Sequence, residues 1–254
     1  MITDMDRILR FSIKGKFAHF RKFYTNSSSL SYVIPPRTVI TGLIASVLKI
    51  PRNQYYDLMG REAIGISVSI PKGKPIKKQM QSMNYLHEDY FNLIAKGTKS
   101  GKVQHSQCKL ELLSGSNGNQ VEYQIHLGFK NTNENLIDFA SKVTGYNLGY
   151  GVYLGQRQFR GYIENLETFT EKEFEKLEAS KFLDTACIQE NITSLELSTE
   201  INIQKEQMPS GFKKVNNGRE AVSTDLVIFE KSGKQLAGEF KNCIYLQDKY
   251  ISFI

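Results

Sequence analysis

Cations alternate with aromatic rings near the start of the chain, in the segment KGKFAHFRKFY at residues 14–24. Aromatic faces can stack unpaired bases while lysine and arginine side chains hold phosphates, so this mixture is typical of binding to single-stranded nucleic acid. We expect Arg21 and Lys22 to contact the nucleic acid. The other interpretation is that the phenylalanines belong to the core and the cations form a solvated rim, and the segment alone favours neither.

A helix with a cation at its start follows, in SYVIPPRTVITGLIASVLKIP at residues 31–51. The paired prolines force an extended approach and are tolerated in a first helical turn, after which apolar residues recur at helical spacing. Arg37 stands where free backbone amides accept anions. Tyr32 is an expected stacking partner for a base. An ordinary core helix is the alternative interpretation.

A long lysine-rich segment occupies residues 71–108. It contains too many apolar side chains for simple disorder, and a connection of this length inside a compact domain is usually functional. We predict a projecting β-hairpin whose cations face a phosphate chain. Its expected RNA contacts are Lys77, Lys78, Tyr85, Lys102 and His105. A solvated basic face is the alternative.

Glycines are dense in GYNLGYGVYLG, at residues 145–155, and two arginines follow them in QRQFRGY. Glycine lets another backbone approach closely, as an RNA strand would, although the pattern by itself indicates turns. We include Arg157 and Arg160 among the expected RNA contacts.

Patterns for catalysis or metal binding are scarce. The four histidines are scattered, without an HExxH pair or a GxSxG elbow, and the basic part of the chain has too few carboxylates for a metal cluster. The cysteines, Cys108, Cys187 and Cys243, form no CxxC pair, so we interpret them as buried thiols. We therefore predict no catalytic residue, no metal and no cofactor.

Charge is distributed unevenly along the chain. Its 33 basic and 26 acidic residues give a net charge of +7, but residues 1–110 hold 18 basic and 6 acidic side chains while residues 111–254 hold 15 and 20. This asymmetry predicts that one part meets a polyanion, with nucleic acid as the leading candidate. There is no signal-peptide pattern and no apolar run near the ~20 residues of a spanning helix, so we expect a cytoplasmic protein without membrane contact.

The elements that position these residues alternate between strands and helices. Strands are predicted at 8–13, 64–70, 109–113, 121–129 and 152–167, and helices within 31–51 and at 133–143. This order predicts an α+β fold with a ferredoxin-like (RRM-like) palm. We place the palm at residues 1–167, with a basic β-hairpin thumb inserted at about 71–108.

The composition becomes acidic from residue 168 onward. Residues 170–180 carry a capping-box pattern and rows of charge that suit an exposed helix or helical turn. Strand-like segments follow at 194–203, 223–233, 238–247 and 249–254. We therefore predict a small C-terminal antiparallel β accessory region over residues 168–254.

Five segments together resemble the Cas-five family of CRISPR-associated proteins, within the RAMP superfamily: FSIKGKFAHFRK, SYVIPPRTVITGLIASVLKI, HSQCKLELLSG, YQIHLGF and YLGQRQFRGYIENL. They occur in order across residues 7–165, and the most specific piece is the proline-proline-arginine helix start with Gly42 behind it. The resemblance implies a subunit of a type I-B-like Cascade complex in antiviral defence, which caps the 5′ handle of the crRNA. It also implies contacts with the large subunit, with the first backbone subunit and with target DNA near its flanking motif.

Two other functions stay open. Some members of this family cut their own guide precursor without metal, and Lys102 and His105 could supply the cation and the base for such a cut. The tyrosine that cutting members carry near the helix end is Leu48 here, and their lysine-histidine pair is Gln104-His105, so we expect a non-catalytic subunit. A basic adaptor protein that touches RNA only incidentally is the second alternative.

Overall fold

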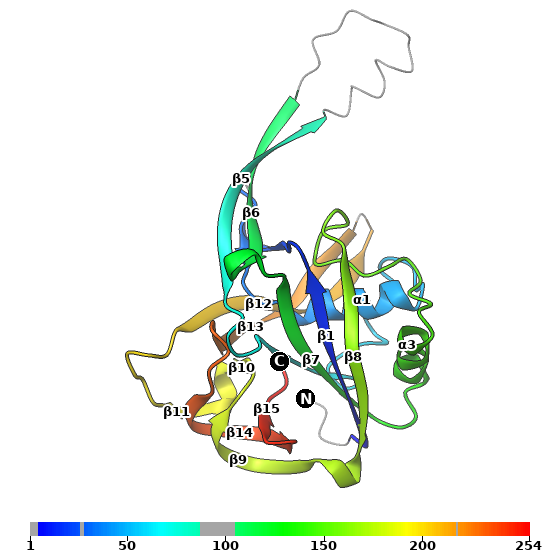
Figure 1. Cartoon of the computed structure of the whole chain (residues 1–254). Coiled ribbons are helices and arrows are strands. Elements are labelled where there is room, and N and C mark those ends of the chain that lie inside the picture. The colour runs from blue at the N-terminus through cyan, green and yellow to red at the C-terminus, as the bar shows by residue number, and fades with distance from the viewer. Residues whose placement is uncertain (1–4, 26–27, 87–104, 217) are drawn as a thin grey trace, which may run out of the picture.

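The computed structural model describes residues 5–25, 28–86, 105–216 and 218–254. Among these residues antiparallel strands predominate and two α-helices are present (Figure 1). The predicted α+β class is therefore confirmed. None of the helices in these ranges is long and apolar enough to cross a membrane.

A four-stranded antiparallel sheet forms the centre of the N-terminal part. Its strands, in spatial order, are β4 (Gly65–Ser69), β7 (Val121–Phe129), β1 (Arg7–Gly15) and β8 (Gly161–Thr170). Phe11 of β1 lies opposite Ile125 of β7, and Ile13 lies opposite Tyr123. Because side chains alternate between the two faces of a strand, these four residues share one apolar face.

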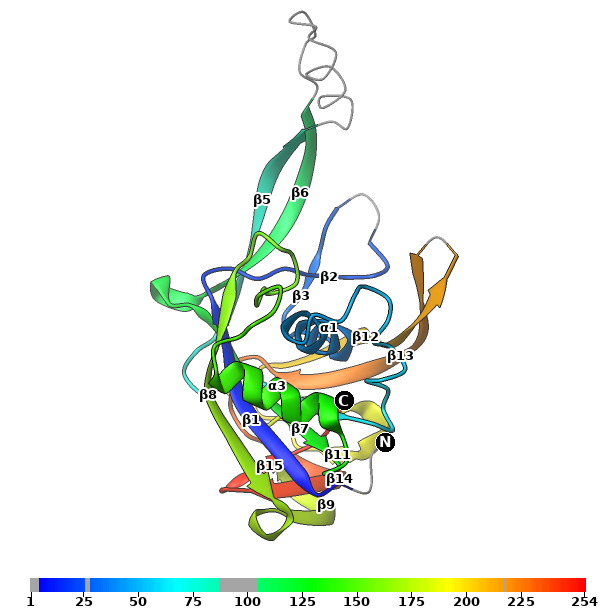
Figure 2. The same cartoon turned by 90° about the vertical axis from the view of Figure 1, so that its right-hand side faces the viewer.

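Two helices pack on that face, α1 (Arg37–Val47) and α3 (Glu134–Thr144). The predicted cap of α3 is present, since the Asn133 side chain accepts a hydrogen bond from the Leu136 N–H at 3.3 Å. Phe139 of α3 packs against Phe11, with ring centroids 5.6 Å apart. α1 lies beside α3 (Figure 2).

Helix α1 begins after the paired prolines, as predicted, but ends before it reaches Pro51. Lys49 has a φ of +60°, a left-handed conformation that commonly ends helices. The Lys49 N–H donates to the Ser46 carbonyl at 3.3 Å. The chain thus leaves the helix through this turn, and the proline follows it.

A long two-stranded hairpin projects from the sheet (Figure 1). Its strands are β5 (Ile76–Leu86) and β6 (His105–Gly115). The strand predicted separately at 109–113 is part of β6. Short strands β2 (Phe20–Arg21) and β3 (Ser31–Tyr32) pair with each other near its base. There the Ala18 N–H donates to the Leu113 carbonyl at 3.0 Å.

The C-terminal part forms two further sheets. One contains β10 (Cys187–Ile188), β13 (Gly218–Glu230) and β12 (Ile203–Val215) in that order. The other is built around β14 (Leu236–Leu246). Three strands pair with it: β9 (Glu175–Leu183), β11 (Ile192–Leu195) and β15 (Lys249–Ile251). The β12–β13 hairpin runs beside α1 (Figure 2).

Of the exposed helix or helical turn predicted at 170–180, the structure contains the turn but not a longer helix. Thr170 and Glu173 form the predicted capping box around a short 3₁₀ turn, but the chain then extends as β9. Pairing with β14 satisfies the backbone of β9, and it places Leu183 in the core. This tertiary pairing outweighs the helical preference of the charged residues.

The C-terminal strands complete the core of the N-terminal sheet. One apolar cluster unites Leu9 and Ile66 with Met208 and Phe229. The outer edge of β4 is covered by the C-terminal part. The Val68 carbonyl accepts a hydrogen bond from the Ala186 N–H at 2.8 Å, and the Ile66 carbonyl accepts one from the Ile254 N–H, also at 2.8 Å. The N-terminal part therefore completes neither this edge nor its core alone.

Two of the three cysteines have the predicted environment. Cys187 and Cys243 are buried, and burial raises the pKa of each thiol, for Cys187 to about 11 and for Cys243 to about 12. Cys108 in β6 is only partly buried, so the expectation of a buried thiol is wrong there.

Candidate nucleic-acid interface

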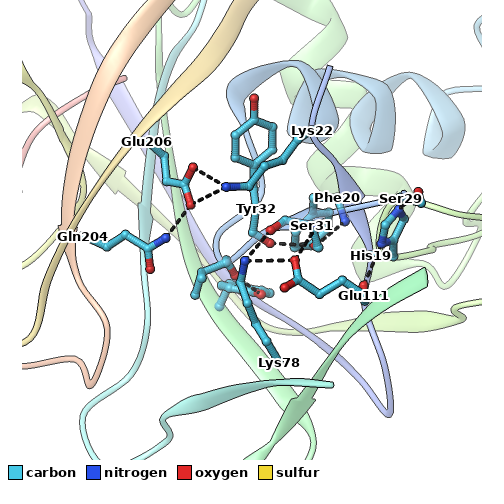
Figure 3. A network of polar contacts seen from close by, with 12 residues as sticks. His19, Phe20, Lys22, Ser29, Ser31, Tyr32, Lys78, Glu111, Gln204 and Glu206 are labelled. Atoms are coloured by element: carbon cyan, nitrogen blue, oxygen red, sulfur yellow. Dashed lines mark hydrogen bonds and ion pairs between the residues drawn. The ribbon is translucent and has the colours of Figure 1, made fainter. Parts of the chain in front are cut away.

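A network of polar contacts ties the basic N-terminal segment to the base of the β5–β6 hairpin (Figure 3). His19 is fully buried, and its Nδ1–H donates to the Glu111 carbonyl at 2.8 Å. Its Nε2 accepts from the Ser29 hydroxyl at 2.9 Å. Burial lowers the pKa of His19, so the neutral ring that this pattern requires is the favoured form.

Lys22 belongs to this network and faces away from solvent. Its Nζ contacts the two carboxylate oxygens of Glu206 at 2.6 and 2.8 Å, and the two side chains are only 12% and 5% exposed. The ammonium also lies 5.5 Å from the ring centre of Tyr32. Burial lowers the pKa of Lys22, but the bond to Glu206 outweighs it and holds the pKa above its ordinary value.

Tyr32 and Lys78 complete the network. The Tyr32 ring is fully buried and its hydroxyl donates to the Gln207 carbonyl at 2.6 Å. Lys78 donates to the Ser31 carbonyl at 2.6 Å and contacts Glu111 at 3.0 Å. These contacts give all three side chains partners within the chain, and stacking of a base on Tyr32 would require its ring to leave the core. RNA contacts by Lys22 and Lys78 stay predictions.

Arg37 is also turned inward. It is 3% exposed, and its Nη2 donates to the Met59 carbonyl at 2.9 Å. Burial, with a contribution from Arg61, lowers its pKa to about 10. Arg37 was expected to bind an anion at the start of α1, but its guanidinium is hydrogen-bonded to the backbone of this chain instead.

A groove lies over the opposite, exposed side of α1 and consists of two adjoining hollows of about 390 and 350 Å³. The hollows share Thr38, Val39, Gly155 and Arg219, so they form one continuous groove. Its cations are Arg21, Arg52 and Arg219, and its rings include Phe23, Tyr55, Tyr150, Tyr153 and Phe212. No carboxylate is among the described residues that line it.

The loop at 145–160 forms one wall of the groove and is fastened to α1. The Tyr150 N–H donates to the Ser46 carbonyl at 2.9 Å, and the Ser46 hydroxyl donates to the Gly151 carbonyl at 2.8 Å. Gly149 and Gly155 have φ values of +56° and +89° and lie directly against the backbone of Val47 and His19. These two glycines therefore allow close packing within the chain, while an approach of RNA backbone to the loop stays a prediction.

The β12–β13 hairpin forms the opposite wall. The guanidinium of Arg219 lies over the Phe212 ring, 4.4 Å from its centre. Phe212 in turn packs near Tyr56, with ring centres 6.0 Å apart, and Tyr56 lies 4.8 Å from Tyr55. A row of ring contacts therefore positions Arg219 at the groove. Figure 2 shows this hairpin alongside α1.

No family model matches the chain, and no curated protein matches it in sequence. Its fold is similar to that of a solved CRISPR protein from Archaeoglobus fulgidus, with a TM-score of 0.56 and 11% identity over 96% of this chain and 98% of that one. A chain of a CRISPR RNA-guided surveillance complex gives a TM-score of 0.51 and 11% identity over 88% of this chain and 90% of that one. This chain has the fold of these CRISPR proteins.

The remaining predicted contacts fall into three groups. Arg21 lines the groove, is exposed, and donates to the Thr25 carbonyl at 3.2 Å. Arg157 and Arg160 are exposed in the turn before β8. On the hairpin, Lys77 is exposed and Tyr85 is 40% exposed. Lys102 lies outside the described residues, as does the side chain of His105, whose backbone begins β6.

Several groove residues were missed by the sequence argument, namely Arg52, Tyr55, Tyr150, Tyr153, Phe212 and Arg219. Tyr150 and Tyr153 stand within the glycine-dense segment, where a signal was present. Arg219 and Phe212 lie in the acidic part of the chain, which was interpreted as an accessory region. No local pattern connects them with α1.

Part of the basic charge of residues 1–110 is paired with carboxylates from the rest of the chain. Six of its cations form ion pairs with carboxylates beyond residue 110: Arg10 with Glu167, Lys14 with Glu164, Lys22 with Glu206, Arg61 with Asp225, Lys74 with Glu122, and Lys78 with Glu111. The uneven charge of the sequence therefore reflects internal pairing as well as any external polyanion.

The part of the chain that the structure describes holds no group of three or more histidine, cysteine, aspartate or glutamate side chains able to bind a metal. His126 is 1% exposed, and burial, with the nearby charges of Arg10 and Lys249, lowers its pKa to about 3. The two described histidine side chains, His19 and His126, are therefore buried, and burial favours their neutral forms.

Proposed function

We propose that this chain is a non-catalytic RNA-binding subunit of a type I CRISPR interference complex, related to the Cas-five family. The observation that carries the proposal is the groove over α1, which combines exposed arginines and rings without a carboxylate, on the fold of CRISPR proteins. Such a surface suits single-stranded RNA, whose phosphates bind cations and whose bases stack on rings.

In this proposal the sheet β4-β7-β1-β8 is the ferredoxin-like palm and the β5–β6 hairpin is the thumb. The strand order supports the palm, because β1 and β7 are central and are flanked by β8 and β4. The exposed Lys77 and Tyr85 on the hairpin support the thumb. The RNA is the 5′ handle of the crRNA, and the protein partners are the large subunit and the first backbone subunit, beside target DNA near its flanking motif.

The test is to purify the chain, sequence its copurified RNA from the 5′ end, and compare binding of that RNA with a scrambled version across a salt series. We expect one 5′ sequence to dominate and to bind more tightly than the scrambled RNA at every salt concentration. Equal binding of both RNAs would instead support a basic adaptor protein.

The absence of catalysis has its own test. The chain is incubated in EDTA with a transcript that contains the repeat found in the copurified RNA. We expect the transcript to stay intact. Cleavage that disappears in His105→Ala would contradict this part of the proposal and identify a metal-independent endoribonuclease.

A further inference from the structure

We infer that the larger hollow of the groove is a pocket for one unstacked nucleotide of single-stranded RNA, whose phosphate is bound from the C-terminal β12–β13 hairpin by Arg219. This inference rests on the proposed RNA-binding function and adds a defined subsite to it. It also gives the C-terminal part of the chain a direct role in binding.

The size of the hollow suits this ligand. Its volume of about 390 Å³ lies near the lower limit of the usual range of about 300 to 1,000 Å³ for small-molecule sites. A single nucleotide is a ligand of suitable size for such a site. Gly42 of α1 lines it, and a Cβ at this position would lie 3.2 Å from the Tyr55 hydroxyl oxygen. The missing side chain therefore keeps open the space between the helix and Tyr55.

The rings of the pocket are held in different ways. Tyr55 is 7% exposed and packs on Tyr56, so it is a fixed wall. Tyr150 is 63% exposed, while its backbone is fastened to Ser46. The anchored backbone fixes the point from which the ring extends, so a ligand does not have to order this part of the loop. A base that enters the hollow can bury the free face of Tyr150.

The cations favour a phosphate beside that base. Arg52 and Arg219 line the hollow, and no carboxylate is among its described lining residues. Arg219 already stacks on Phe212, which orients its guanidinium while leaving its N–H groups at the edge of the plane for an anion. Lys22, by contrast, has Glu206 as its partner. The hollow is thus a site where positive charge has no carboxylate partner among the described lining residues.

The experiment measures binding of the full chain to a fluorescein-labelled ten-uridine RNA and to a ten-residue abasic ribose-phosphate chain of the same charge. Tyr150→Ala is compared with Tyr146→Ala, which removes a ring that is 89% exposed and does not line the hollow. Arg219→Ala is compared with Lys213→Ala, whose side chain faces the other side of β12, opposite Glu220.

We expect Tyr150→Ala to weaken binding of the ten-uridine RNA about tenfold with an unchanged salt slope, and to weaken binding of the abasic chain less than twofold, because the lost contact is with a base. Arg219→Ala should weaken both probes about three- to tenfold and lower the salt slope by about 0.7, as expected for one lost phosphate contact. Both control variants should stay within about twofold of the wild type on the ten-uridine RNA.

The two levels of the proposal fail in different ways. If the wild type binds neither probe nor its copurified RNA at low salt, the RNA-binding function itself is overturned, and the pocket with it. Binding of the copurified RNA alone would overturn only the pocket. If the wild type binds RNA but Tyr150→Ala and Arg219→Ala bind like their controls, the pocket is overturned and the RNA-binding function stands. Equal losses for Tyr150→Ala on both probes would also overturn the assignment of a base to this ring.

Discussion

Arg21 and Lys22 are neighbours in sequence and alike in charge, but they belong to different regions of the molecule. Lys22 points into the polar network and is bound to Glu206, whereas Arg21 is exposed and lines the groove over α1. Both regions combine cations with aromatic rings. The difference is that carboxylates and carbonyls of the chain satisfy the network (Figure 3), while the described lining of the groove contains no carboxylate.

Residue type and spacing therefore do not by themselves distinguish a binding surface from a polar network inside the protein. The deciding feature is whether an acceptor from elsewhere in the chain reaches each cation. The network is therefore expected to control stability, and the groove to control RNA affinity.

Glu206→Gln should lower the free energy of unfolding by about 3 kcal/mol, because it leaves the buried Lys22 ammonium without its counterion. Chemical denaturation measures the loss, and RNA affinity of the folded fraction should not change. The double variant Lys22→Met with Glu206→Met should recover most of the stability, since apolar side chains replace both charges. Lower RNA affinity in that stable double variant would contradict the division.

Acidification from pH 7 to pH 5 should destabilise the fold. The pKa of His19 and that of His126 are both lowered in the folded state by burial. The unfolded chain therefore takes up protons first as the pH falls below about 6.5, and stability present above that pH is lost. The loss is about 2 kcal/mol for each histidine that stays neutral.

Thermal unfolding across this pH range measures the effect, and the variant with His19→Gln and His126→Gln should show a flatter profile. Arginine keeps its charge throughout the range, so the groove itself should bind RNA unchanged at pH 6, where the protein is still folded. A pH dependence that is equally steep in the double variant would mean that other groups carry it.

Tyr32→Phe should cost about 1 kcal/mol of stability, because the partly buried hydrogen bond from the Tyr32 hydroxyl to the Gln207 carbonyl is lost. The ring itself is kept, so a stacking role would survive this substitution and a structural role would not. Denaturation curves and RNA titration together decide. Unchanged stability of the variant would contradict the structural role of the Tyr32 hydroxyl.

Arg21→Ala should change stability by less than about 0.5 kcal/mol and weaken RNA binding about fivefold, with a lower salt slope. The matched control is Lys16→Ala, which removes an exposed cation from the same segment and does not line the groove. Similar losses for the two variants would show that the groove contributes nothing beyond general charge.

The elements with strong local signals were predicted well. Strand β7 occupies the expected residues 121–129, and α3 starts at its Asn133 cap. Strand β12 was missed because Pro209 and Gly211 interrupt its pattern, and the structure accommodates them with shifts of register in the pairing with β13. Periodicity carries no information on such irregularities.

The site was less accessible to sequence reasoning than the fold. Glu206 lies 184 residues from Lys22, and only the folded chain brings the two together. The segment around Lys22 therefore left open whether its cations contact RNA or form a solvated rim, while Arg219 was placed in an acidic accessory region. Tyr150 was the groove residue that a local pattern of glycines and tyrosines came nearest to identifying.

The covered edge of β4 has a further consequence for the behaviour of the protein in solution. An open edge strand offers unpaired backbone groups to other chains and promotes aggregation. Here the N–H groups of Ala186 and Ile254 donate hydrogen bonds to the carbonyls of Val68 and Ile66 on that edge. Fragments that lack the C-terminal strands should therefore self-associate through β4, and their insolubility would reflect an uncovered sheet rather than a lost binding site.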